Sequence, residues 1–167
     1  MARSIHSRAI IFSMPEERLM PLFLEGVIEP KLYNRWLTRK AAALVRRDLK
    51  RGHQCTAKQY RENIHNAVIR SEGKDEYTGE TLAWELISTY NNDDSKLGKH
   101  GYKAGFALLP TIGHEVAEST TASFRICGWR TNDSKNDLSL EAFLQLCEKM
   151  LNYAGYHIEK PIASSDH

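Results

Sequence analysis

The spacing of apolar residues changes near residue 105, and this change limits the folds that the chain can adopt. Before it, apolar residues recur at three- and four-residue steps, the period of amphipathic helices. After it come two short apolar segments bounded by turn residues, as strands are. A helical period returns from Asn132. The pattern predicts an α+β protein in which an N-terminal helical region precedes a strand–strand–helix unit.

Capping patterns and glycines bound the predicted elements. Thr56-Ala57-Lys58-Gln59 has the spacing of a capping box, as does Ser13-Met14-Pro15-Glu16, where Pro15 suits an early helical position. The prediction is four helices over residues 13–26, 30–52, 56–73 and 81–90, a loop over 91–105, strands over 106–112 and 123–130 with a turn between them, and a last helix from 132 to 151. Trp84, Trp129 and Phe143 are predicted core residues.

These elements predict three parts. Residues 1–100 form a helical region with a basic helix, residues 101–155 form a ββα unit, and residues 156–167 form a tail. A chain of 167 residues with 41% hydrophobic content can bury a real core.

Composition predicts a cytoplasmic protein that does not enter a membrane. The three cysteines form no C-x-x-C pair, and their odd number does not favour a secreted disulfide framework. No apolar stretch reaches the ~18 residues that span a bilayer, and the first residues lack the apolar segment of a signal peptide.

A candidate catalytic motif lies in the ββα unit. His114 closes the first predicted strand, in Pro110-Thr111-Ile112-Gly113-His114, and a stretch from Phe124 to Asn136 leads through the second strand into the helix. With the upstream turn Tyr77-Thr78-Gly79-Glu80, this arrangement resembles the motif of HNH (ββα-metal) endonucleases.

The resemblance implies a ββα-metal fold and a set of site residues. His114 matches the general base that activates water, and Asn132 matches a ligand whose carbonyl oxygen suits Mg²⁺ or Mn²⁺. Lys135 falls where it could neutralise a phosphate oxygen. Ser123 falls nearest to the middle residue of the motif, usually an asparagine that orients the histidine.

Two positions depart from the family pattern. Gly113 stands where the family usually has an aspartate that binds the metal, and Ser123 is shorter than the usual asparagine. In an alternative register, Asn132 is the middle residue and Asn136 is the metal ligand. The carboxylates near enough to replace the missing aspartate are Glu115, Glu118, Asp133 and Asp137.

A run of basic residues lies on the second predicted helix, with Asp48 as the single acid beside it. The run comprises Lys31, Arg35, Arg39, Lys40, Arg46, Arg47, Lys50 and Arg51, of which the last seven are the candidate nucleic-acid contacts. Such a helix could lie along the phosphates of a nucleic acid, face solvent, or meet an acidic protein partner or a second copy of the chain.

Together these features predict a metal-dependent endonuclease that hydrolyses phosphodiester bonds, with DNA favoured as substrate. Small nucleases of this kind resemble components of restriction, mobile-element or phage-defence systems. The alternative is a catalytically impaired protein that keeps the ββα scaffold and binds nucleic acid or forms a complex. Gly113 is the feature that separates the two.

Overall fold

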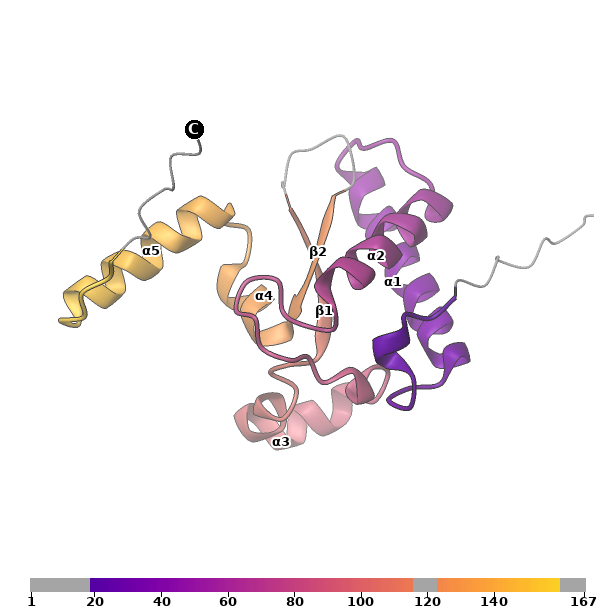
Figure 1. The fold of residues 1–167 in the computed structure, drawn as a ribbon, viewed down its shortest axis with the longest axis horizontal. Helices are drawn as coiled ribbons and strands as arrows, with labels where there is room; N and C mark the ends of the chain where they lie inside the picture. Colours follow the sequence, from indigo (N-terminus) through magenta and orange to yellow (C-terminus); the bar gives the residue numbers. More distant parts are fainter. Residues whose placement is uncertain (1–18, 116–122, 160–167) are drawn as a thin grey trace, which may run out of the picture.

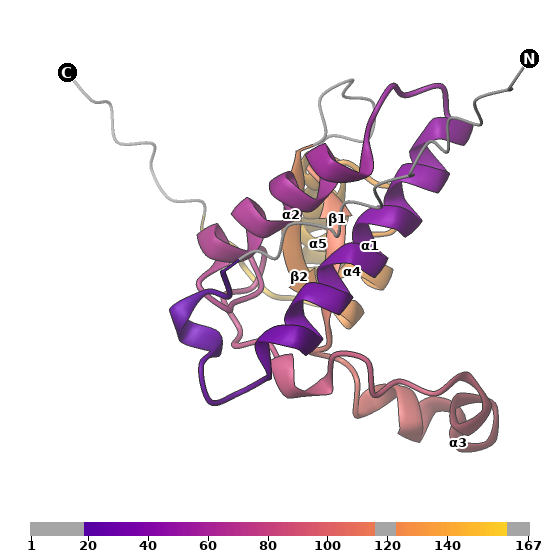
Figure 2. The same cartoon turned by 90° about the vertical axis from the view of Figure 1, so that its right-hand side faces the viewer.

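The computed structural model describes residues 19–115 and 123–159, and it is an α+β protein. Its elements are the short 3-10 helices η1 (Leu22–Leu24) and η2 (Trp84–Leu86), the helices α1 (Pro30–Lys50), α2 (Ala57–Ser71), α3 (Asn92–Ala104), α4 (Trp129–Lys135) and α5 (Leu140–Tyr153), and the strands β1 (Pro110–His114) and β2 (Phe124–Gly128). The strand pair lies between α1 and α2 on one side and α4 on the other (Figures 1 and 2).

The two long N-terminal helices form as their sequences predict. Pro30 occupies the first turn of α1, where its missing N–H costs nothing. The predicted capping box of α2 is present: Thr56 accepts from the Gln59 backbone, and the Gln59 side chain accepts from the Thr56 backbone. α1 and α2 pack against each other, and α2 also packs against β2.

The strands form one antiparallel pair whose register places the site. Pro110 pairs with Gly128 and His114 pairs with Phe124, so β1 ends at His114 beside the beginning of β2. The chain passes from Gly128 directly into α4, which contacts both strands. The strand–strand–helix order is thereby confirmed.

One hydrophobic core joins the N-terminal helices to the strand pair. Tyr33 and Trp36 of α1 and Ile64 of α2 belong to the same buried cluster as Phe124 and Ile126 of β2. The helices that precede residue 100 therefore help to hold the strands in place.

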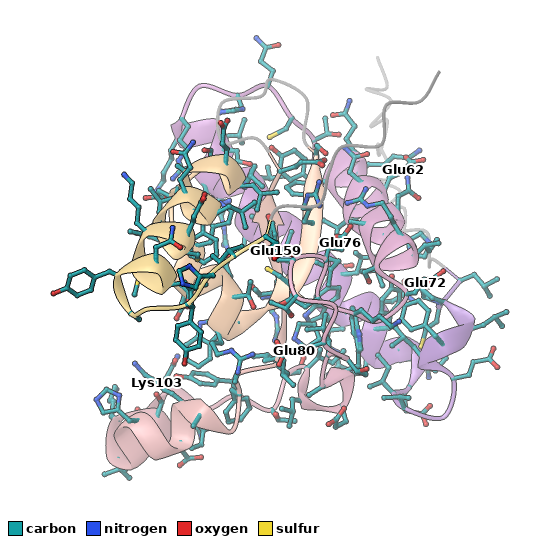
Figure 3. The ribbon with its side chains drawn as sticks, turned by 60° about the vertical axis from the view of Figure 1, so that its left-hand side comes forward. Glu62, Glu72, Glu76, Glu80, Lys103 and Glu159 are labelled. Atoms are coloured by element: carbon teal, nitrogen blue, oxygen red, sulfur yellow. The ribbon has the colours of Figure 1, made fainter. Side chains whose placement is uncertain are left out.

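The predicted turn near residue 77 is formed and joins the strands to the helical half. Buried Asp75 accepts from the backbone N–H groups of Tyr77, at 2.8 Å, and Gly128, also at 2.8 Å. Glu80 forms an ion pair with Arg130 of α4 at 2.7 Å. Figure 3 shows Glu76 and Glu80 along this segment, beside the strand pair.

Two helix predictions in the N-terminal half are wrong. Of the predicted helix 13–26, residues 13–18 lie outside the described part, and the rest holds only η1, with Leu22 exposed. In place of a helix over 81–90 there is only η2. Thr81 instead bridges Lys74, and the backbone of Ser88 takes the left-handed conformation at φ 66°. The backbone of this segment pairs with residues elsewhere in the fold, as at Lys74, and therefore does not form the helix that its local pattern predicts.

The loop predicted over 91–105 is also wrong, because that segment forms α3. Asn91 caps the helix by accepting from the Asp93 backbone at 2.9 Å. Near the C-terminal end of α3, the rings of Tyr102 and Phe106 pack against the ring of Tyr90, which lies just before the helix. Two glycines within α3 obscure its helical period in the sequence.

The strand and C-terminal helix bounds differ from the prediction. The first strand begins at Pro110, not at residue 106, and the second ends at Gly128. The last helix divides into α4 and α5 at Asn136, whose φ is 49°.

Of the predicted core residues, only Trp84 is confirmed as buried. Trp129 is half-buried, and Phe143 lies on α5, which contributes no buried residue. Figure 1 shows why, since α5 stands away from the rest of the molecule. No helix in the described residues is both long and apolar enough to cross a membrane.

Candidate active site

A cavity of about 430 Å³ opens beside the end of β1. Its walls come from the end of α1, from β1 and from α4 with the residues after it. They comprise Arg47, Arg51, Ile112, Gly113, His114, Asn132, Asp133, Lys135, Asn136 and Asp137. The fold thus brings three of the predicted catalytic residues, His114, Asn132 and Lys135, to one cavity together with Asn136.

His114 is held between two charged side chains from α1. Its Nε2 lies 2.8 Å from Oδ2 of Asp48, and its Nδ1 lies 2.7 Å from Nη2 of Arg47. A carboxylate only accepts and a guanidinium only donates. The neutral ring therefore carries its proton on Nε2, which donates to Asp48, and Nδ1 keeps a lone pair that accepts from Arg47.

Asp48 is the buried anchor of this arrangement. Its side chain is 1% exposed, and Oδ2 also accepts from the Tyr60 hydroxyl of α2 at 2.7 Å. Burial acts to raise the pKa of Asp48, but the hydrogen bonds from Tyr60 and His114 and the nearby Arg47 charge outweigh it. The pKa lies below its ordinary value, so the carboxylate is ionised at neutral pH.

The surroundings of His114 favour the neutral imidazole. Burial lowers the pKa of His114 below its ordinary value of 6.5, and the charges of Arg47 and Arg51 lower it further. The hydrogen bond and charge of Asp48 act in the opposite direction and offset part of this. A neutral imidazole at pH 7 is the form that can accept a proton from water.

Asn132 faces Gly113 across the cavity. A Cβ placed on Gly113 would lie 3.5 Å from Oδ1 of Asn132, in ordinary van der Waals contact. Within the described residues the Asn132 side chain makes no hydrogen bond. Its amide is therefore available to a ligand in the cavity.

Lys135 and Asn136 lie at the end of α4. The Lys135 ammonium donates to the carbonyl oxygen of Leu138 and lines the cavity. Asn136 is exposed and ends the helix. Asn132 of α4 and Asn136, which directly follows the helix, both border the cavity, which is compatible with either register of the motif.

Ser123 does not meet His114. Its hydroxyl donates to Oε2 of Glu115, and Oε1 of the same carboxylate accepts from Nη2 of Arg125 at 2.6 Å. The hydrogen bonds from Ser123 and Arg125 lower the pKa of Glu115. Asp48, from a helix more than sixty residues earlier, takes the orienting place at His114 that the motif predicted for Ser123.

The cavity holds oxygen donors but no preformed metal cage. Within 19–115 and 123–159, no group of three His, Cys, Asp or Glu side chains could hold a metal ion. Of the candidate carboxylates, Asp133 and Asp137 line the cavity, Glu115 does not, and Glu118 lies outside the described residues. These oxygens fit a hard cation such as Mg²⁺ that is shared with substrate phosphates.

The basic run divides between the site and solvent. Arg47 and Arg51 line the cavity at His114, whereas Arg39 and Lys40 line a second cavity further along α1. The other basic residues of the run, Lys31, Arg35, Arg46 and Lys50, are exposed and line neither of these cavities. The run is thus neither a uniform contact surface nor a wholly solvated face.

Asp48 and Tyr60 are the site residues that sequence reasoning missed. The signal for Asp48 was present, because it is the one acid within the basic run. An isolated carboxylate on the buried face of a basic helix needs partners, and a histidine and a tyrosine supply them. Tyr60 carried no such signal, since it fits the apolar stripe of its helix.

No protein-family model, curated protein or solved structure matches this chain.

Proposed function

We propose that this protein is an endonuclease that hydrolyses phosphodiester bonds in DNA at the cavity around His114. The observation that supports it best is a neutral histidine whose Nε2–H is bound to a buried carboxylate, in a cavity bordered by Arg47, Arg51 and Lys135. A positioned base and cations that neutralise phosphate charge are what this hydrolysis requires. The HNH resemblance and the strand–strand–helix order support the same proposal.

His114 would act through Nδ1. When a substrate phosphate draws the Arg47 guanidinium away, the Nδ1 lone pair faces the cavity. A water molecule then attacks phosphorus and gives its proton to Nδ1, while the bond from phosphorus to the leaving oxygen breaks. The leaving oxygen takes a proton from solvent, and Asp48 stabilises the imidazolium that forms.

A divalent cation would bind at the oxygens beside His114. Asn132 and Asn136, with Asp133 and Asp137, would hold it together with the substrate phosphate. A bound Mg²⁺ or Mn²⁺ supplies neutralisation of the charge that develops on the phosphate oxygens.

Plasmid cleavage in Mg²⁺ or Mn²⁺ tests the proposal. We expect wild-type protein to nick or cut the plasmid and His114→Ala to lose ~10²–10⁴-fold of the rate, the usual contribution of a general base. The matched control is His100→Ala, which removes an exposed histidine of α3. Equal cleavage by His114→Ala and wild type would refute the assignment.

A catalytically impaired DNA-binding protein is the second candidate. Gly113 brings no carboxylate to the cavity, and Arg47 occupies Nδ1 of His114. This function predicts that DNA binds with steep salt dependence and is not cut under any of the metal conditions.

A further inference from the structure

A second cavity, of about 500 Å³, lies beside the first half of α1 and away from His114. Trp36, Arg39 and Lys40 border it from α1, and Tyr90 and Trp129 border it from the other side. Its described lining contains two cations and three aromatic rings and no carboxylate. A volume of this size suits a small organic anion.

Lys40 provides an anion-binding group within this cavity. Its side chain is half-buried, and in the described part of the chain it forms neither a hydrogen bond nor an ion pair. Burial lowers the pKa of Lys40, and the neighbouring Arg39 charge lowers it further. An anion bound between Lys40 and Arg39 would stabilise the charged ammonium of Lys40, and so act against the burial and the Arg39 charge that lower its pKa.

The aromatic side of the cavity is held in place by its neighbours. The Tyr90 ring meets Trp129 edge to face at 5.4 Å and Phe106 at 5.0 Å, and its hydroxyl donates to Oγ of Ser95 at 2.6 Å. Rings fixed in this way can receive a planar ligand without first losing side-chain freedom. Nucleobases stack on such rings irrespective of their sequence.

The two cavities lie in succession along the same elements. Lys40 and Arg47 are seven residues apart, on the same face of α1, which corresponds to ~10 Å of helix. Pro110 and Thr111 border the second cavity, and the following residues of β1 border the first. A DNA strand can cover this separation in a few nucleotides.

We propose that the second cavity is a subsite for one unpaired nucleotide of the DNA strand, with its base on Tyr90 and Trp129 and its phosphate between Arg39 and Lys40. Its role in positioning a strand for cleavage at His114 rests on the proposed function, whereas binding itself does not. A base inside a duplex is not free to stack on protein rings, so the subsite selects single-stranded or locally opened DNA.

Binding of a fluorescein-labelled ten-nucleotide single-stranded DNA tests the phosphate contact. Fluorescence anisotropy in EDTA at several salt concentrations measures affinity without cleavage. We expect Lys40→Gln to weaken binding about tenfold and to reduce the slope of log affinity against log salt by ~0.7, the loss of one phosphate contact. The control Lys31→Gln removes an exposed charge from the same helix and should stay within about twofold of wild type.

A ten-unit abasic strand of the same charge tests the stacking contact. Wild-type protein should bind it several-fold more weakly than the ordinary strand, and Trp129→Leu should remove most of that difference. If Trp129→Leu does not fold, the wild-type comparison decides the point.

Equal affinity of wild type for both strands, or equal effects of Lys40→Gln and Lys31→Gln, would overturn the subsite while leaving cleavage at His114 untouched. Conversely, if wild-type protein failed to cut the plasmid, the proposed nuclease function would be refuted, but the binding measurements would still test the subsite.

Discussion

Oδ2 of Asp48 in α1 accepts from Nε2 of His114 at the end of β1 over 2.8 Å, although the two residues are 66 positions apart in the chain. The same oxygen accepts from the Tyr60 hydroxyl of α2 at 2.7 Å. One buried carboxylate thus connects both N-terminal helices to the histidine. The helical half of the protein is therefore part of the candidate site.

Asp48→Asn tests whether Asp48 positions and polarises His114. The amide keeps the shape but removes the charge, so we expect cleavage to fall by about 10²-fold or more. Because Asp48 acts to raise the pKa of His114, that pKa should fall further in the variant, as NMR titration of the imidazole would show. If Asp48 had only a structural role, the pKa of His114 would be the same in the variant as in wild type. Asp94→Asn, an exposed acid of α3, is the matched control.

The larger substitution Asp48→Ala should destabilise the fold. It leaves the buried Tyr60 hydroxyl and the His114 N–H without their acceptor, at a cost of about 1–3 kcal/mol for each unsatisfied group. Urea unfolding monitored by circular dichroism measures this loss. An unfolding free energy equal to that of wild type would mean that Asp48 does not hold these elements together.

The pKa of His114 predicts how cleavage and stability depend on pH. Cleavage needs the neutral ring, so the rate should rise with pH through the folded-state pKa and level off by pH ~6.5, the ordinary value. Since the pKa of His114 is lower in the folded protein than in the unfolded chain, the unfolded chain binds more protons at pH values between these two pKa values. This contribution to stability is present above pH ~6.5 and is lost as the pH falls through the folded pKa.

Rate profiles and urea unfolding across pH 5–8 would check both parts, with His114→Gln as the comparison. In that variant, the His114 contribution to the pH dependence of stability should disappear. A cleavage rate that keeps rising above pH ~7.5 would contradict His114 as the titrating base.

Gly113→Asp would supply the carboxylate that the motif lacks. The site has room, because the new Cβ would meet Oδ1 of Asn132 at 3.5 Å and Gly113 does not need a positive φ. We expect tighter binding of Mg²⁺ or Mn²⁺ and faster cleavage. The gain should vanish in the double variant Gly113→Asp, His114→Ala.

Gly113→Asn has the same shape without the charge and serves as control. Mg²⁺ should raise the Tm of Gly113→Asp more than that of Gly113→Asn, which gives a readout independent of cleavage. A folded Gly113→Asp protein that binds the cation but never cuts would favour the DNA-binding function.

Gly128 tests the junction between β2 and α4. A Cβ there would lie 2.9 Å from the backbone carbonyl oxygen of Ala107, so one of the two segments must move. We expect Gly128→Ala to destabilise the protein by about 1–3 kcal/mol in urea unfolding. The control Gly101→Ala adds a methyl group within α3 with nothing within 4 Å, and should be neutral or slightly stabilising. Equal stability of the two variants would show that the junction is not tightly packed.

The local parts of the fold could be read from the sequence. The proline at the start of α1, the capping box of α2 and the change of apolar spacing lie within a few residues of the structures that they specify. The order of β1, β2 and α4 followed from the same kind of pattern, as did the place of His114 at the end of its strand. These features depend on interactions between near neighbours in the chain, and so the sequence displays them directly.

The tertiary structure decided where the elements meet. Only the tertiary structure brings Asp48 of α1 to His114 of β1, and Tyr90 makes ring contacts with Tyr102 and Phe106 from the segment where the local sequence suggested a loop. Likewise, α5 has the apolar stripe of a buried helix yet contributes nothing to the core. A periodic pattern reports which face of an element is apolar, but the partner of that face and the charges that meet at a site depend on residues distant in the chain.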